Sequence, residues 1–348
     1  MGSPFVTPDP SPTPPGTPTP SETGSSRPSS IEIDADEVVL PLPGIGSIAV
    51  WGPVAWYTAP DSHRVYRVDF EDGAIDVVAE AGRGYPSSID ANELSVAWTE
   101  WVPKPGRHSS WRVMSQVADG DSPQAVVIDE STDTRTGSLY DISSVLDLNG
   151  DAIAYTSGAP TTDNPLASEI RYGNLRQDEP FHQFETDLVP YDVAIGESGV
   201  LYSIGSVDPE AFGEIVDPKL MIYGAGSDAP QPVADDALSV ALDGARMVWA
   251  SGDQVLTAIV GATEHTVLSE SVSDSSLPVA AAEGLVTWSE VAPDGRHLLK
   301  IWNSESGATY QADESSSPLL ASIGGGWLAW NNESAVKAVS LEELRAAF

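Results

Sequence analysis

The sequence contains no cysteine, few basic residues and no long hydrophobic run. The absence of cysteine excludes disulfides, thiolate zinc sites, iron–sulfur clusters and cysteine nucleophiles. Only 16 Lys and Arg stand against 52 Asp and Glu, so the 348-residue chain carries a formal charge of −36. A charge of this sign excludes a general binder of nucleic-acid backbones, because polyanions are repelled. No apolar run reaches the roughly 18 residues of a membrane-spanning helix.

Motifs for metal or nucleophilic chemistry are also absent. The five histidines are scattered along the chain and form no pair with the spacing of zinc ligands. There is no Gly-x-Ser-x-Gly elbow and no glycine-rich phosphate loop. We therefore predict no catalytic set, no metal site and no cofactor from motifs.

What the chain does contain is enough apolar sequence for a folded core. Hydrophobic residues make up 41% of it and charged residues only 20%, unlike a disordered acidic chain. The negative charge favours cationic partners or simply keeps the protein soluble.

Residues 1–30 differ from the rest of the chain. They are dominated by Pro, Ser, Thr and Gly, which cannot build a core, and indicate a disordered, partly polyproline-II tether. Met1-Gly2-Ser3 is typical of a cloning remnant. A tether of this kind commonly spaces a folded domain from an anchor, so we expect an extracytoplasmic, cell-surface or secreted protein with a native anchor, such as a lipoprotein cysteine, before residue 4. A disordered N-terminus on a cytosolic protein is the alternative.

An internal repeat organises residues 31–348. Seven times, an apolar strand and a tight turn lead to a second strand whose core ends in an aromatic residue. These aromatics are 39 to 57 residues apart and comprise Trp56, Trp98, Tyr155, Tyr202, Trp249, Trp288 and Trp330. Third strands such as 64–70 and 298–303, and fourth strands such as 75–81 and 308–314, follow in most units. Four short strands per forty-odd residues are typical of a propeller blade.

The pattern predicts an all-β fold, a seven-bladed β-propeller of four-stranded antiparallel blades. The seventh unit stops after its third strand, 335–341, and an unassigned strand, 37–40, precedes the first unit. Pairing that N-terminal strand onto the last blade would close the ring without a disulfide and leave no open edge. Residues 340–343 read as a capping box that opens a short terminal helix. We expect a monomer.

The repeated aromatic strand ending, the Gly or Asn turn before it and the apolar–aromatic third strand resemble the TolB-like and WD-repeat-like propellers of bacteria. The resemblance implies a rigid extracytoplasmic scaffold for recognition and carries no catalytic residues. The Trp-Asp and Gly-His signatures of WD repeats are absent, and Pro293-Asp294-Gly295 is the nearest relic of a TolB-type turn. Few lysines beside twelve arginines fit an actinobacterial source, and acidic halophiles share part of that bias.

One segment imitates a calcium loop. Residues 147–151 read Asp-Leu-Asn-Gly-Asp, half of an oxygen-rich loop. They fall where the other units place the tight turn, and no glutamate follows at the required offset. We interpret them as a turn, with calcium as the open alternative.

Long connections predict the functional face. In a four-stranded blade the connections from strand two to three and from strand four to the next blade emerge on one face. The connections 99–110, 156–168, 203–218 and 289–297, and the segments 129–141 and 270–278, are long, and binding residues concentrate on long loops. Trp101 and Trp111 lie outside the repeat register beside a basic loop, so we expect them on an exposed recognition surface. The predicted binding residues are Trp101, Arg107, His108, Trp111, Tyr140, Asp208, Glu210, Phe212 and Glu290. The alternative is that these loops simply differ in length.

Two functional hypotheses follow. The first is a non-enzymatic, envelope-tethered scaffold that binds a protein, peptide or glycan through its loop-rich face. The second is a glycosidase or lyase with paired carboxylates at the channel mouth, drawn from acids such as Asp90, Asp141, Asp192 and Glu290. Two carboxylates with an Arg or His converging there would favour the enzyme, and a channel lined by Ala, Ser and Val would disfavour it. The external sensor domain of a membrane protein is a third possibility.

Overall fold

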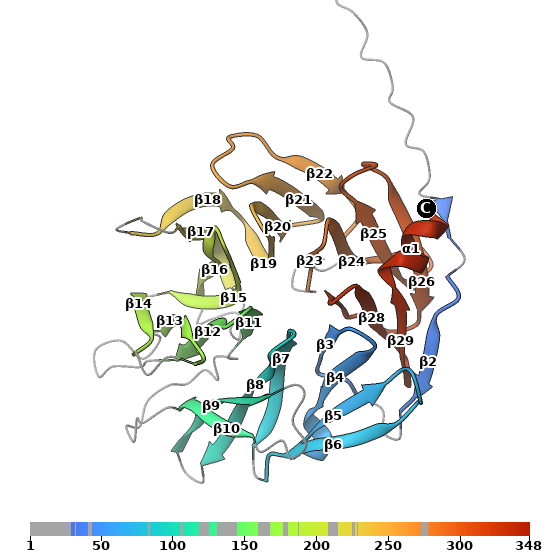
Figure 1. Ribbon diagram of the computed structural model, residues 1–348. Helices are drawn as coiled ribbons and strands as arrows, with labels where there is room; N and C mark the ends of the chain where they lie inside the picture. Colours follow the sequence, from blue (N-terminus) through green and yellow to red (C-terminus); the bar gives the residue numbers. More distant parts are fainter. Residues whose placement is uncertain are drawn as a thin grey trace, which may run out of the picture.

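The computed structural model forms a ring of seven blades around a central axis (Figure 1). It describes residues 29–31, 33–40, 44–82, 84–104, 107–117, 125–130, 145–158, 168–176, 180–186, 188–207, 215–224, 227, 229–272 and 278–348.

Each blade is a four-stranded antiparallel sheet, numbered here from the N-terminal blade. The innermost strands are β3 (Ser47–Trp51), β7 (Tyr85–Ala91), β11 (Leu146–Asn149), β15 (Val189–Gly196), β19 (Ala237–Asp243), β23 (Ala280–Ala282) and β27 (Ala321–Gly324). The second strands are β4 (Val54–Ala59), β8 (Ser95–Lys104), β12 (Ala152–Gly158), β16 (Gly199–Val207), β20 (Arg246–Ser251), β24 (Leu285–Val291) and β28 (Trp327–Asn332).

The outer half of each blade completes the sheet. The third strands are β5 (Arg64–Asp69), β9 (Arg107–Val117), β13 (Ser168–Asn174), β17 (Ile215–Gly224), β21 (Gln254–Ile259), β25 (His297–Asn303) and β29 (Ala335–Ser340). The outermost strands are β6 (Ile75–Glu80), β10 (Val126–Glu130), β14 (His182–Thr186), β18 (Gln231–Asp235), β22 (Thr266–Ser269), β26 (Thr309–Ser315) and β2 (Asp36–Val39). The predicted seven-bladed, all-β fold is confirmed.

The N-terminal strand closes the ring as predicted. β2 pairs antiparallel with β29, with Val38 opposite Val336, and so supplies the fourth strand of blade 7. A second contact was not predicted: β1 (Ser29–Ser30), assigned to the tether from the sequence, adds in parallel to β26 as a fifth strand of blade 6. The N-terminal segment therefore pairs with strands of blades 6 and 7 before the first repeat begins.

The core lies between the blades. All seven repeat aromatics are buried, with exposed fractions of 0 to 4%. Trp56 of blade 1 and Trp98 of blade 2, for example, share one cluster with Val65 and Met114. Each of the seven repeat aromatics packs between two blades.

Of the predicted capping box at the C-terminal helix, the serine cap is present, while the glutamate bonds the serine hydroxyl instead of its backbone N–H. The helix α1 (Leu341–Ala347) follows Ser340, whose Oγ accepts the Glu343 N–H at 3.2 Å and donates to the Glu343 carboxylate at 2.6 Å. Leu341 and Leu344 are buried against blades 6 and 7. No helix in the described part of the chain is both long and apolar enough to cross a membrane.

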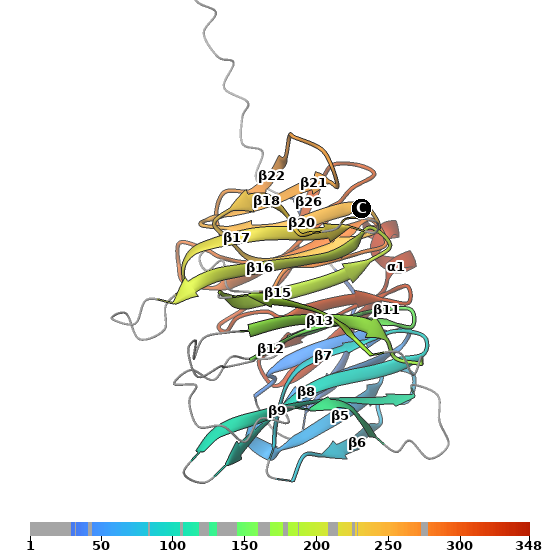
Figure 2. The ribbon, with the colours of Figure 1, turned by 90° about the vertical axis from the view of Figure 1, so that its left-hand side faces the viewer.

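The two faces of the ring differ. Turns between first and second strands are tight, with Gly150, Gly244 and Gly325 at positive φ. On the opposite face, the β8–β9 and β16–β17 hairpins have strands of nine to eleven residues. Figure 2 shows both hairpins extending to one side of the ring, away from α1. We call this side the hairpin face.

One expectation about these connections is wrong in detail. Residues 99–104 and 107–110 continue strands β8 and β9, and residues 203–207 and 215–218 continue β16 and β17, so two of the predicted long loops are mostly strand. Strand pairing supplies the backbone hydrogen bonds that a free loop would leave to water. The segment 131–144 and residues 159–167 lie outside the described part of the chain.

Candidate functional site

The hairpin face carries a row of three aromatic rings. His63 lies 4.3 Å from Tyr85, and Tyr85 lies 5.2 Å from Trp101, between ring centroids. All three side chains are only partly buried. The indole Nε1 of Trp101 is itself buried but has no hydrogen-bond partner in the structure. We call His63, Tyr85 and Trp101 the aromatic row.

Strand pairing in blade 2 and a hydrogen bond between blades 1 and 2 hold the aromatic row in place. Trp101 pairs in register with Tyr85 between β8 and β7. His63 has a φ of +57°, and its Nδ1 lies 2.7 Å from the carbonyl oxygen of Gly84, next to Tyr85. The corner between β4 and β5 of blade 1 is thereby held against the start of blade 2. Trp101 was predicted from the sequence, whereas Tyr85 was not, because it lies where a blade begins rather than in a long connection.

Trp111 was expected on an exposed surface, but the structure places it inside the fold. It is only 9% exposed and belongs to the cluster between blades 2 and 3, where its ring lies 6.0 Å from Tyr155. The guanidinium of Arg171 stacks 5.6 Å from its ring centroid. Trp111 has the environment of a packing residue.

Glu290 is also engaged inside the fold. Its carboxylate accepts the indole N–H of Trp288 at 3.0 Å, bonds the Ser269 hydroxyl and lies 3.6 Å from the Lys300 ammonium. Its side chain is 14% exposed. These contacts leave it little freedom to serve a ligand.

The remaining predicted residues give less information. Arg107 and His108 lie on β9, next to the end of the β8–β9 hairpin. Tyr140, Asp208, Glu210 and Phe212 lie outside the described residues.

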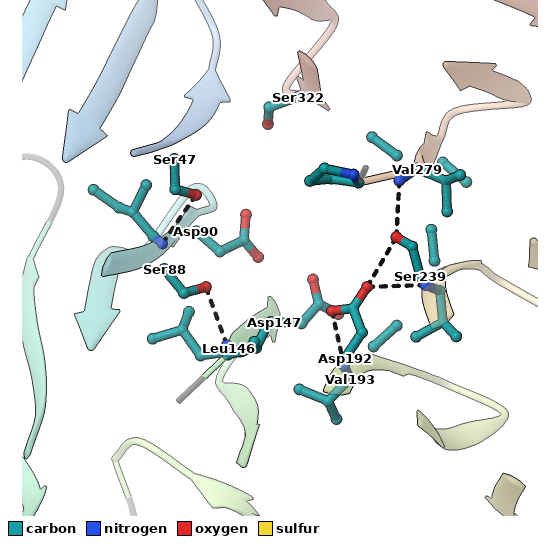
Figure 3. Close-up of a pocket in the computed structure, with 18 of the residues that line it drawn as sticks. Ser47, Ser88, Asp90, Leu146, Asp147, Asp192, Val193, Ser239, Val279 and Ser322 are labelled. Carbon is teal, nitrogen blue, oxygen red and sulfur yellow. Dashed lines mark hydrogen bonds between the residues drawn. The ribbon is translucent and has the colours of Figure 1, made fainter. Parts of the chain in front are cut away.

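A cavity of about 540 Å³ occupies the central channel. It is lined by residues of all seven innermost strands. Apart from Asp90, Asp147, Asp192, Tyr191 and several serines, its walls are Ala, Val, Leu, Ile, Gly and Pro, and no Lys, Arg or His lines it among the described residues. Figure 3 shows the three aspartates on neighbouring strands of one wall.

These polar side chains join the blades. An innermost strand pairs with its sheet on one side only, so backbone N–H groups on its other edge need acceptors. At six junctions, side-chain oxygens of the preceding blade accept N–H groups of an innermost strand or of the residue directly before it. At the seventh, between blades 6 and 7, the donor is Gly326 in the turn after β27; all distances are 2.6 to 3.4 Å, and Figure 3 shows part of the set. The pairs are Ser47 with Ile89, Ser88 with Leu146, Asp90 with Leu148, Asp147 with Ile195, Asp192 with Val240, Ser239 with Val279, Glu283 with Gly326 and Ser322 with Val50. We call this set the junction ring.

The three channel aspartates have raised pKa values. Burial raises the pKa of Asp90 to about 6, against the lowering effect of the Leu148 and Ala91 N–H donors. Burial likewise raises the pKa of Asp192 to about 6. Burial, and then the charge of neighbouring Asp90, raises the pKa of Asp147 well above its usual range. Each carboxyl group already accepts a backbone N–H of the next blade through one of its oxygens.

A second set of contacts was missed from the sequence. The repeat aromatic of several blades donates to a carboxylate that also pairs with a cation. Trp98 donates to Glu100, which pairs with Arg112; Trp330 donates to Asp313, which pairs with Lys337; Tyr155 bonds Asp129, which pairs with Arg171. Asp129 and Asp313 come from the neighbouring blade, so these triads also join blades.

The supposed calcium segment is a strand followed by a turn. Asp147 accepts the Ile195 N–H, Gly150 has a φ of +57°, and Asp151 pairs with Arg176 at 2.8 Å. No cluster of three potential metal ligands occurs among the described side chains. Calcium binding itself stays an untested alternative.

Comparison with known proteins finds the fold and no close relative. No protein-family model matches the chain, and no curated protein matches it. A chain of the mitotic checkpoint complex is similar, with 12% identity over 87% of this chain and 94% of that one, and a TM-score of 0.55. YCF48 bound to D1 peptide has 10% identity over 90% and 98% of the two chains, with a TM-score of 0.55.

A third similar structure is the β-propeller domain of the Trilobed protease from Pyrococcus furiosus. It has 9% identity over 84% of this chain and 92% of that domain, with a TM-score of 0.54, and is described as having an open velcro topology. In contrast, β2 closes the ring of the present chain. Identities this low establish the fold alone. The resemblance to TolB-like and WD-repeat-like propellers is consistent with these neighbours, and the chain is a closed, seven-bladed β-propeller.

Proposed function

We propose that the protein is a non-enzymatic scaffold that binds a protein or peptide through its hairpin face. The single observation that carries the proposal is the aromatic row: three partly exposed rings in contact, ending in a tryptophan with an unpartnered N–H. Partly exposed aromatic rings held on a rigid scaffold are typical of interface hot spots.

The position of the row supports this role. Trp101 stands on β8, one of the longest strands in the described part of the chain, in a hairpin that extends from a rigid ring. Recognition residues concentrate on segments that a rigid scaffold positions. The opposite face offers mainly tight turns and the docked helix α1.

The neighbours support a protein or peptide as the partner. One similar propeller is seen bound to a peptide, and another belongs to a multiprotein complex. A glycan remains a second candidate from the sequence, but no observation in the structure favours it.

The channel argues against the enzyme hypothesis. A general acid or base needs oxygens free to reach a substrate proton. Asp90, Asp147 and Asp192 instead accept backbone N–H groups of the next blade, and no described cation lines the cavity. Three carboxylates therefore line the cavity, but no described Arg or His converges with them, as the enzyme hypothesis requires.

We also propose a location outside the cytoplasm, supported by the Pro-, Ser- and Thr-rich composition of residues 1–30. Fractionation of native cells with an antibody against residues 31–348 tests this. Recovery in the cytosolic fraction would rule it out.

Peptide selection tests the binding function. A phage-displayed library of random peptides of roughly twelve residues is panned against the protein, and the enriched peptides are measured by calorimetry. We expect Trp101→Ala to lower the affinity for these peptides at least about tenfold, because the loss of one hot-spot side chain has an effect of this size. Trp327→Ala is the matched control, because Trp327 is also partly buried but starts β28 at the opposite face. No enrichment, or equal effects of both variants, would refute the proposal.

A further inference from the structure

The junction between blades 6 and 7 contains three buried polar atoms that have no hydrogen-bond partner in the described part of the chain. They are the hydroxyl oxygens of Thr287 and Ser289 on β24 and the Nδ1 atom of His297 on β25. The Thr287 and Ser289 residues are each only 1% exposed. A buried polar group without a partner loses its bonds to water and gains none in return, so native folds leave few of them.

Strand register places the three atoms on one face of blade 6. Thr287 and Ser289 are two positions apart in β24, so their side chains point to the same side. They pair with Ile301 and Leu299, which belong to the cluster between blades 6 and 7, and His297 lies diagonally across from Ser289. Opposite and diagonal positions of an antiparallel pair are about 5 to 8 Å apart. The three polar atoms therefore share one narrow space between the blades.

The position of Ser289 is bonded to protein in other blades. Ser289 follows the repeat aromatic Trp288, and in four other blades the residue after the repeat aromatic is also polar. The bonded pairs are Thr99 with Ser87, Thr156 with Val145, Ser203 with Leu238 and Asn331 with Leu320. Of these five polar residues, only Ser289 has no partner in the described structure.

The direct bonds of the junction ring are also displaced here. Glu283 of blade 6 reaches Gly326 in the turn after β27, and no described side-chain oxygen accepts an N–H of β27 itself. The reason lies in β23, the innermost strand of blade 6, which comprises only the three alanines Ala280–Ala282. Alanine side chains have no acceptor, so this strand cannot bond the open edge of the next one.

The terminal segments close the outer side of the same junction. β1 pairs with β26 of blade 6, and β2 pairs with β29 of blade 7. Between these two strands, Ile31 and Ile33 pack against the cluster that contains Leu299, and Leu344 of α1 belongs to that cluster. The unpartnered polar atoms therefore lie in an otherwise apolar junction that the N- and C-terminal segments cover.

We infer that ordered water molecules bind between blades 6 and 7, at Thr287, Ser289 and His297, and take the place of the direct bonds that join other blades. Water fits these atoms because it accepts a hydroxyl proton and also donates to a hydroxyl oxygen or an imidazole nitrogen. Buried waters typically make about three hydrogen bonds to polar groups that otherwise have no partner. A bond through water is nearly as favourable in enthalpy as a direct one.

A crystal structure of the full chain at about 1.5 Å resolution tests the inference directly. We expect electron-density peaks for water within about 3.2 Å of Thr287 Oγ1 and Ser289 Oγ. A junction without such peaks, or hydroxyl groups that bond protein atoms directly, would overturn the inference.

Urea denaturation of Thr287→Val provides a second test in solution. Valine keeps the shape of the side chain but removes the hydroxyl, so a bound water loses one of its bonds and the urea midpoint should fall. The matched variant is Thr257→Val, because Thr257 is 2% exposed and its hydroxyl donates directly to the Met247 carbonyl at 2.9 Å. Its midpoint should fall as well.

A dry junction gives the opposite result for Thr287. A buried hydroxyl without any partner destabilises the fold, and valine removes that cost. An unchanged or higher midpoint for Thr287→Val, beside a lower one for Thr257→Val, would therefore overturn the inference. Neither test depends on the proposed binding function, since both concern the folded protein alone.

Discussion

The carboxylate of Asp192 in blade 4 accepts the backbone N–H of Val240 in blade 5 at 2.9 Å. The same oxygen accepts the Ser239 hydroxyl at 3.1 Å. One side chain thereby satisfies the open edge of the next innermost strand. The arrangement recurs, with Ser or Asp oxygens, around the channel.

Removing this acceptor should destabilise the propeller. In Asp192→Ala the Val240 N–H loses its partner at a buried junction, and we expect a loss of about 1–3 kcal/mol in the free energy of unfolding. Urea denaturation measures it. Asp253→Ala, at an exposed turn position, is the control and should change stability by less than about 0.5 kcal/mol. Equal stability of the two variants would show that the junction ring does not stabilise the propeller.

The same aspartate makes stability depend on pH. Its folded-state pKa of about 6 exceeds the ordinary value of 3.8, so the folded protein holds this proton more tightly than the unfolded chain. The contribution to stability is complete below about pH 4 and is lost as pH rises through about 6. Asp192→Asn cannot titrate. We therefore expect wild type to gain stability relative to Asp192→Asn, by about 1 kcal/mol or more, between about pH 7.5 and about pH 4.5. If the unfolding free energies of wild type and Asp192→Asn differ by the same amount across this pH range, the raised pKa of Asp192 is contradicted.

Asp313 should show the opposite dependence. Burial acts to raise its pKa, but hydrogen bonds from Trp330, Asn332 and Lys337 outweigh that effect and lower it. Its contribution is present above the ordinary value of 3.8 and is lost as pH falls through the lowered value. Asp313→Ala should therefore cost more stability at about pH 7 than at about pH 3, because the triad needs the ionised carboxylate. Urea unfolding curves of wild type and Asp313→Ala at the two pH values measure this cost, and an equal cost at both would contradict the prediction.

The two tryptophans of the β8–β9 hairpin should separate folding from binding. Trp111→Ala empties a site between blades 2 and 3 and should cost about 3–5 kcal/mol of stability. Trp101→Ala should cost far less, about 1 kcal/mol, but weaken peptide binding. A stability loss at Trp101 as large as that at Trp111 would make Trp101 a core residue too.

Closure by β2 should dominate the stability of the ring. Deleting residues 1–28 leaves β1 and β2 in place and should change the urea midpoint little. Deleting residues 1–40 exposes the edge of β29 and removes Leu40 and Val38 from their cluster, so a loss of several kcal/mol is expected. Similar midpoints for the two truncations would show that the N-terminal strand is dispensable.

The repeat aromatics made the blades predictable because burial between blades demands a large apolar side chain at one register position. The triads were not predictable in the same way. Arg67, Arg171, Lys300 and Lys337 face Trp56, Tyr155, Trp288 and Trp330 across the second and third strands. The hairpins between them differ in length, so no fixed spacing reveals the pairing.

The candidate site was predictable only in part. Trp101 could be identified because it breaks the repeat register, and the same reasoning misplaced Trp111, whose contacts lie in blade 3. Sequence position also could not tell that Asp90 and Asp192 face backbone N–H groups of neighbouring blades. Contacts between blades depend on how adjacent sheets are set against each other, which a local pattern does not specify.

Hydrogen–deuterium exchange of the protein with a selected peptide bound tests the central claim most directly. The account predicts new protection confined to the hairpin face, in residues 80–117 around the aromatic row and the β8–β9 hairpin. Protection at the turns of the opposite face, near residues 150, 244 and 325, or only in the innermost strands of the channel, would contradict it.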